Sequence, residues 1–146
     1  MKKNALGVLV IGLLTFAVAA QKGDRVKDKL QGVWVVVSLD SAGKNVPEEL
    51  LTGQTLTFKG DTIIYNKKFN ENGEKEVATY KIDVSKKPAQ IDMTPTGGPE
   101  KDKTTKMIFL LNGDTLKIAG KIGSEKRPAD FEGADLSIMM LKRQMK

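Results

Sequence analysis

The sequence predicts an all-β fold of about eight short strands, arranged as a sandwich or a barrel. Segments rich in Val, Ile, Thr and aromatic residues recur along the chain, and turn signals separate them at intervals of roughly 8 to 12 residues. Helical periodicity is almost absent. The first and last strands are apolar on both faces, which favours a closed barrel because closure pairs these strands with each other.

The first twenty residues have the three parts of a secretory signal peptide. The segment 1–3 is basic, Ala5 to Val18 is almost wholly apolar, and small residues lead up to Ala20. The apolar part is shorter than the ~20 residues that cross a bilayer. We therefore expect cleavage after Ala20, or nearly as readily after Ala19, giving a periplasmic or secreted product with no integral membrane span after cleavage.

The chain has no cysteine, so we expect neither the lipid anchor of a bacterial lipoprotein nor a disulfide. Cleavage leaves 146 − 20 = 126 residues, enough for one domain held together by its core. Residues 21–29 are polar, show no apolar period and predict a short, mobile leader. The expected organisation is a signal peptide at 1–20, a polar leader at 21–29 and a barrel domain at 30–146.

Removal of Lys2 and Lys3 leaves 22 basic against 18 acidic side chains, so the formal charge falls from +6 to +4. The basic residues are scattered, and few aromatic residues lie among them to stack on bases. We expect a solvated surface, a monomer and no nucleic-acid partner. A weak attraction to an anionic cell-wall polymer is the other interpretation of this charge.

The domain is expected to begin at Leu30 with a strand over residues 33–39. This strand is apolar on both faces, so it is predicted to be central or bent across the core. A turn follows at 40–44. One or two helical turns are expected at 47–51, because Pro47 begins the segment and Gly53 follows it.

The middle of the chain predicts a hairpin and a half-buried strand. Residues 55–58 and 62–65 flank a tight reversal at 60–61. A turn at 70–74 leads into a strand over 77–83, in which one face is formed by Ala78, Tyr80 and Ile82.

Three further strands and a closing strand are expected. Residues 90–94 alternate, and a polar loop follows. Residues 105–111 and 115–119 flank Asn112-Gly113-Asp114, a turn in which Asn and Gly accept positive φ angles. The closing strand, 136–143, has Ile138 and Met140 on one face and Met139 and Leu141 on the other.

Four short blocks carry a family resemblance over the run from Leu30 to Arg143. They are Gly32-Val33-Trp34, Ile91-Asp92-Met93-Thr94-Pro95-Thr96, Asn112-Gly113-Asp114-Thr115-Leu116-Lys117 and Arg127-Pro128-Ala129-Asp130-Phe131. In this order they resemble an uncharacterised lipocalin-like domain family of planctomycete bacteria. The resemblance implies a single up-and-down antiparallel barrel of about eight strands, and the family has no established activity. Ala119 stands where members often have a cysteine, and residues 122–124 are shorter and less apolar than in the family.

Lipocalin-like barrels carry a Gly-x-Trp on the first strand, with a basic residue of the last strand covering the tryptophan. The resemblance therefore implies a structural barrel end formed by Gly32, Trp34 and Arg143. An Arg guanidinium over an indole contributes on the order of 1 kcal/mol. The alternative role of Trp34 is to stack on a ligand.

The composition excludes several kinds of catalysis. With no histidine and no cysteine, Ser-His-Asp and Cys-His nucleophilic catalysis and the usual zinc and iron sites are excluded. The Ser-x-x-Lys pattern that begins at Ser41 lies in a glycine turn, and the acidic residues lie in surface segments with few aromatic platforms for sugar rings. We expect no enzymatic activity, no cofactor and no metal.

Two groups of residues are candidates for binding. The first group faces the barrel interior, where it lines a cavity or fills the core, and consists of Phe58, Tyr80, Ile82, Met107, Phe109 and Met140. The second is the loop that contains Arg127, Asp130 and Phe131. There, Arg127 and Asp130 are placed to pair, and Phe131 either caps one barrel end or contacts a ligand.

The leading hypothesis is an exported, non-enzymatic barrel that binds a small apolar or amphipathic molecule, or an envelope component. The alternative is a filled barrel that acts through its loops on an envelope protein or polysaccharide. An enzyme of unfamiliar type, using Arg127 and nearby carboxylates, is the third hypothesis.

Overall fold

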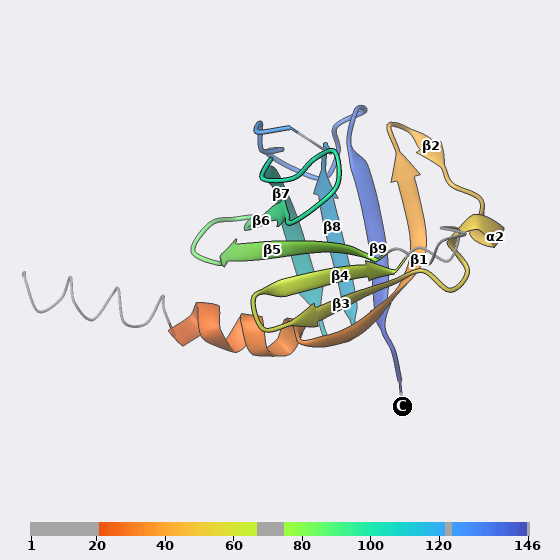
Figure 1. The fold of residues 1–146 in the computed structure, drawn as a ribbon. Helices are drawn as coiled ribbons and strands as arrows, with labels where there is room; N and C mark the ends of the chain where they lie inside the picture. Colours follow the sequence, from red (N-terminus) through yellow and green to blue (C-terminus); the bar gives the residue numbers. More distant parts are fainter. Residues whose placement is uncertain (1–20, 67–74, 122–123, 146) are drawn as a thin grey trace, which may run out of the picture.

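The computed structural model describes residues 21–66, 75–121 and 124–145, and its strands form a closed barrel (Figure 1). Eight antiparallel strands follow one another in chain order, and pairing of the first with the last closes the barrel. They are β1 Gly32–Ser41, β3 Thr55–Lys59, β4 Thr62–Asn66, β5 Glu76–Asp83, β6 Ala89–Pro95, β7 Thr105–Asn112, β8 Thr115–Gly120 and β9 Ser137–Arg143. The predicted all-β, up-and-down barrel is confirmed.

Two short elements lie between β1 and β3. The strand β2, Lys44–Asn45, pairs back on the end of β1, and the helix α2, Glu48–Leu51, follows it. The helical turn predicted after Pro47 is therefore present, and its Leu51 is buried. The expected signal peptide at 1–20 and the expected turn at 70–74 lie outside the described residues.

The bend in β1 explains why its sequence is apolar on both faces. Its first residues pair with β3, while a longer stretch pairs with β9, and the register shifts between Val36 and Ser38. Trp34 and Val36 face the core, whereas the bulge leaves Val37 exposed. The bulge bends β1 so that it pairs with β3 on one edge and with β9 on the other.

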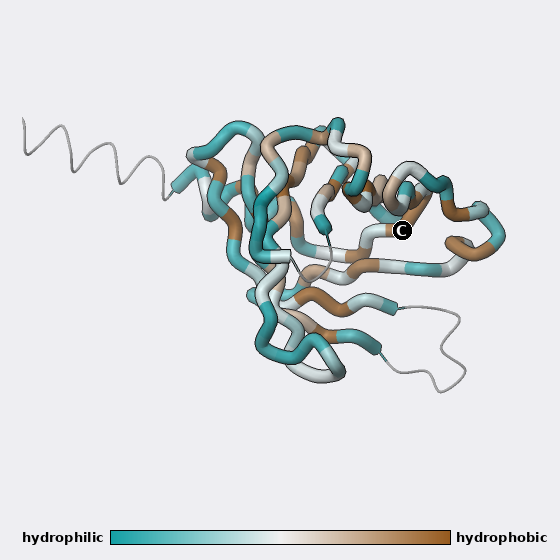
Figure 2. The backbone as a smooth tube through the Cα atoms, turned by 90° about the horizontal axis from the view of Figure 1, so that it is seen from above, coloured by the Kyte–Doolittle hydropathy of each residue, from teal (hydrophilic) through white to brown (hydrophobic). Residues whose placement is uncertain are grey.

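The barrel interior is occupied by large apolar side chains that form one contiguous cluster. Alternate residues of each strand point inward, and apolar residues recur along the strands (Figure 2). The buried members are Leu30, Trp34, Val36, Leu51, Leu56, Phe58, Ile63, Tyr80, Ile91, Met107, Phe109, Leu116, Ile118 and Leu141. An eight-stranded barrel is just wide enough for side chains to fill it, as they do here.

Most of the residues predicted to face the interior belong to this cluster, but Met140 does not. Ile82 is half-buried against the cluster, whereas Met140 lies on the opposite face of β9 from Met139 and Leu141. Leu141 pairs with core positions of both β1 and β8 and is fully buried. The prediction for Met140 is therefore wrong, because both faces of β9 are apolar and alternation could not choose between them.

Residues 21–30 are helical, whereas the sequence predicts a short, mobile leader over residues 21–29. The helix precedes β1 and lies across one end of the barrel (Figure 1). Leu30 is fully buried in the core, and Val26, one turn earlier, packs against the core. Two apolar residues are too few to give a detectable helical period. Within the described residues, no helix is long and apolar enough to cross a membrane.

Candidate functional site

Trp34 and Arg143 are stacked at the end of the barrel that the helix covers. They are direct cross-strand partners in the β1–β9 pairing, and the guanidinium carbon of Arg143 lies 4.3 Å from the centroid of the indole ring. The Trp34 side chain is fully buried, and its Nε1 donates a hydrogen bond to the Leu30 carbonyl at 2.8 Å. The contact implied by the family resemblance is present. A tryptophan covered in this way has no face left for a ligand.

Arg143 also joins the helix to the rest of the barrel. Its guanidinium donates to the Gln31 carbonyl at 3.0 Å, to the Lys29 carbonyl, and to an Asp114 carboxylate oxygen at 3.2 Å in the β7–β8 turn. The backbone at the start of β1 requires a glycine at Gly32, because its φ of +115° is one that residues with a Cβ rarely adopt.

Replacing Arg143 with alanine is expected to lower the free energy of unfolding by about 2 kcal/mol, because two backbone carbonyls lose a charged donor and the indole loses its cover. Trp34 fluorescence should shift, and the thermal midpoint should fall. Arg143→Lys should recover little of the loss, since an ammonium cannot cover the ring and span both carbonyls. An unchanged emission spectrum and midpoint in Arg143→Ala would contradict this role.

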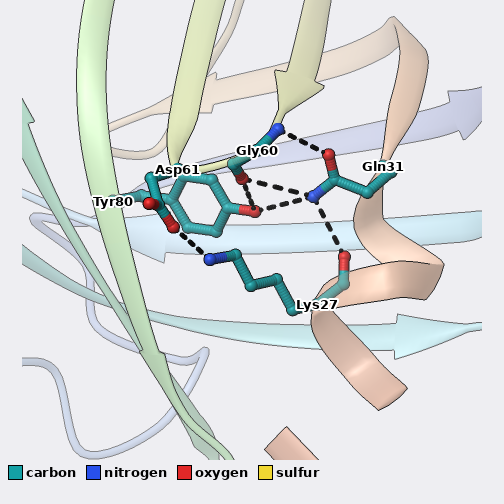
Figure 3. Close-up of polar contacts among 5 residues, drawn as sticks. All are labelled: Lys27, Gln31, Gly60, Asp61 and Tyr80. Carbon is teal, nitrogen blue, oxygen red and sulfur yellow. Dashed lines mark hydrogen bonds and ion pairs between the residues drawn. The ribbon is translucent and has the colours of Figure 1, made fainter. Parts of the chain in front are cut away.

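Gln31 forms a second junction between the helix and the barrel (Figure 3). Its side-chain oxygen accepts from the Gly60 backbone N–H at 2.7 Å, and its side-chain nitrogen donates to the Tyr80 hydroxyl at 3.0 Å. The Tyr80 hydroxyl in turn donates to the Gly60 carbonyl at 2.9 Å. This network fixes the β3–β4 turn against the residue that connects the helix to β1.

Lys27 adds an ion pair one helical turn before Gln31. Its Nζ pairs with Asp61 and lies 5.9 Å from the centre of the Tyr80 ring. The hydrogen bond to Asp61 raises the pKa of Lys27 above its ordinary value. Lys27 is half-buried and Asp61 is exposed to solvent, so this pair positions the helix more than it stabilises the fold.

An open groove of about 450 Å³ lies beside this network, between the helix and the end of β5. Its apolar part consists of Tyr80, Ile82 and Val84, and its charged and polar part of Asp24, Lys27, Asp61, Lys81, Asp83 and Ser85. Hydrogen bonds from Ser85 hold the pKa of Asp83 below its usual range, so this carboxylate is ionised at neutral pH. The groove therefore combines partly exposed apolar side chains with fixed charges.

Tyr80→Phe is expected to lower stability by about 1 kcal/mol at neutral pH, because Gln31 and Gly60 lose a partner. Burial raises the pKa of Tyr80 above 10.0. A raised folded-state pKa contributes stability below pH 10 that is lost as the pH rises through the folded value. The stability difference between the two proteins in urea unfolding should therefore narrow above pH 10. A difference that stays constant with pH would contradict this assignment.

The loop candidates lie elsewhere, on the outer surface. Arg127 donates to the Met107 carbonyl and to Asp92 Oδ1, both at 2.7 Å, so its acidic partner is Asp92 and not Asp130. Asp130 instead accepts the backbone N–H of Glu132. The expected pairing of Arg127 with Asp130 is wrong, because a carboxylate that accepts from the loop backbone stabilises a local turn.

Phe131 does not cap the barrel end, as one interpretation of the sequence predicts. Lys117 Nζ lies 4.7 Å from the centre of its ring. Lys117 alternates with the buried residues Leu116 and Ile118, so it points outward from β8. Phe131 therefore lies on the outer face of the barrel, where the loop folds back over β8.

The sequence did not single out Lys27, Gln31 or Asp61, which form the junction beside the groove. They come from a segment without an apolar period and from a hairpin turn, and no local pattern links them. The sequence offers one signal for this junction, which is the polar residue Gln31 immediately before the Gly-x-Trp.

The protein is thus a closed, eight-stranded, antiparallel barrel with a helix across one end and a groove beside that helix. Within the described residues, no three His, Cys, Asp or Glu side chains are grouped to hold a metal ion. Comparison with protein-family models, curated proteins and solved structures found no match to this chain.

Proposed function

We propose that this chain is an exported, non-enzymatic, lipocalin-like binding module that takes a small amphipathic molecule in the groove between the helix and β5. The observation that carries the proposal is the groove itself, with a partly exposed apolar surface at Ile82 and Val84 beside ionised Asp83. Its volume of about 450 Å³ is within the range of small-molecule sites. The sequence of residues 1–20 supports export.

The packed interior supports a site outside the barrel's centre. The side chains of Phe58 and Ile63 are almost completely buried, and Phe58 packs edge-on against Tyr80 with ring centres 5.2 Å apart. A ligand in the centre would have to displace such side chains, whereas the groove is already open to solvent.

Native mass spectrometry of the protein purified from its own envelope tests the proposal. The expected result is the mass of the chain from Gln21 plus a stoichiometric extra mass that organic solvent removes. The same spectrum tests cleavage after Ala20.

Gly23→Trp should abolish the extra mass by filling the groove. A Cβ at Gly23 meets no atom within 4 Å, so the indole enters open space without disturbing the fold. Gly97→Trp is the matched control, because Gly97 is equally open but lies in the β6–β7 loop at the other end of the barrel. Equal retention of the ligand in both variants would exclude the groove.

A second candidate is a filled barrel that acts through its surface on another envelope component. The contiguous buried core favours it. A bare chain in the mass spectrum, without any extra mass, would support this candidate over the first.

A further inference from the structure

The outer face of β5, β6 and β7 carries a row of charged residues that the groove does not explain. In the strand register, Lys81 lies opposite Asp92 on β6, and Asp92 lies opposite Lys106 on β7. Each of the three alternates with inward-facing residues of its strand, so all three point away from the core. Adjacent strands lie about 4.8 Å apart, which places the two lysines about 10 Å from each other on either side of Asp92.

Arg127 brings a further cation onto this row. It is bound to Asp92 at 2.7 Å and to the Met107 carbonyl at 2.7 Å, so its position on the sheet is fixed. Asp92 is thus already neutralised, while neither Lys81 nor Lys106 forms an ion pair within the described part of the chain.

The charges nearby do not cancel this excess. The pKa of Asp83 is lowered chiefly by hydrogen bonds from Ser85 and further by the positive charges of Lys86 and Arg127. Lys86 and Arg127 therefore lie close enough to Asp83 to interact with it electrostatically. The four cations are Lys81, Lys86, Lys106 and Arg127. The nearby carboxylates are Asp83, Asp92 and, across the groove from Lys81, Asp24, because Asp61 is already paired with Lys27, which leaves one positive charge in excess.

Beside the charged row, the outward residues of β5 and β6 are polar, whereas β7 contributes the buried Ile108 and the exposed Leu110. None of the outward residues of these three strands is aromatic. Thr79 and Thr94 adjoin the charged row on one side, and Gln90 adjoins it on the other. Tyr80 and Phe109 point into the core, so neither can stack on a nucleic-acid base. Hydroxyl and amide groups beside fixed cations match the hydroxyl and acid groups of a charged sugar chain.

We propose that the outer face defined by Lys81, Asp92, Lys106 and Arg127, here called the basic face, docks an anionic polysaccharide. The acid groups of the polymer pair with Lys81 and Lys106, and the Arg127–Asp92 pair holds the loop flat against the sheet between them. This proposal does not depend on a ligand in the groove.

Titration calorimetry with a carboxylated oligosaccharide, oligogalacturonate, tests this proposal, with an uncharged maltooligosaccharide of the same length for comparison. We expect binding of the charged sugar only, weakening steeply with salt. The double variant Lys81→Gln/Lys106→Gln should weaken binding by about tenfold. Since Lys81 also lines the groove, Lys106→Gln alone should give part of the loss and leave any groove ligand in place.

The matched control is Lys44→Gln/Lys142→Gln, which removes the same charge from exposed lysines on β2 and β9. It should change the affinity by less than about twofold. Equal weakening by both double variants would show attraction to net charge alone and overturn the proposal, as would unchanged binding in Lys81→Gln/Lys106→Gln. Tighter binding to anionic lipid vesicles through the same two lysines would also overturn it.

Discussion

Trp34→Ala is expected to lower the free energy of unfolding by about 3–5 kcal/mol, the largest effect of any substitution considered for this protein. The indole is fully buried at the barrel end, so its removal leaves a large cavity in the core. The change also leaves the Leu30 carbonyl without its donor and the Arg143 guanidinium without its ring. Urea unfolding followed by far-UV circular dichroism measures this loss.

Trp34→Phe separates packing from hydrogen bonding. Phenylalanine keeps an aromatic face for Arg143 but cannot donate to Leu30. Its cost should therefore lie well below that of Trp34→Ala. A loss of less than about 1 kcal/mol in Trp34→Ala would mean that this end of the barrel does not hold the fold together.

The second large effect is expected at Gly120, where β8 ends against the core. A Cβ placed on Gly120 would lie 2.2 Å from Cγ of Met107 and 3.1 Å from both its Cβ and its Sδ. The clash involves the inner part of the Met107 side chain, which cannot move aside without a change of rotamer or backbone. Gly120→Ala should therefore destabilise the protein by about 3 kcal/mol in the same urea measurement.

A double-mutant cycle identifies the cause of this loss. Met107→Ala alone should cost about 2–4 kcal/mol by leaving a cavity, whereas Gly120→Ala in that background should cost much less than it does alone. Gly97→Ala is the control, because a Cβ there meets no atom within 4 Å. Strict additivity of the Gly120 and Met107 changes would be incompatible with the steric explanation.

The strands and hairpins could be predicted because a half-buried strand shows its two faces in the sequence. Ala78, Tyr80 and Ile82 alternate with polar residues, and the structure turns all three inward. The same reasoning failed on β9, where Met140 and Leu141 are equally apolar and only pairing with β1 decides which one is buried. On such a strand, tertiary pairing and not the local sequence determines which residues face the core.

The candidate site could be predicted only where a family pattern linked distant residues. The stacking of Arg143 on Trp34 followed from the resemblance, although the two residues are far apart in the chain. Arg127 found its partner 35 residues away at Asp92, while the nearer Asp130 was the obvious choice from the sequence. The groove could not be predicted either, because one of its walls is the helix over residues 21–30, whose sequence shows no apolar period.

Closure of the barrel through β1 and β9 also orders the events of its synthesis. Until the ribosome has made Ser137–Arg143, β1 lacks the partner with which it forms its longest pairing, and β8 has a free edge. The contacts that complete the fold join residues more than a hundred positions apart, such as Arg143 and Gln31. The pairings from β1 to β8 can form as the chain lengthens, but the barrel closes only after its last strand is available.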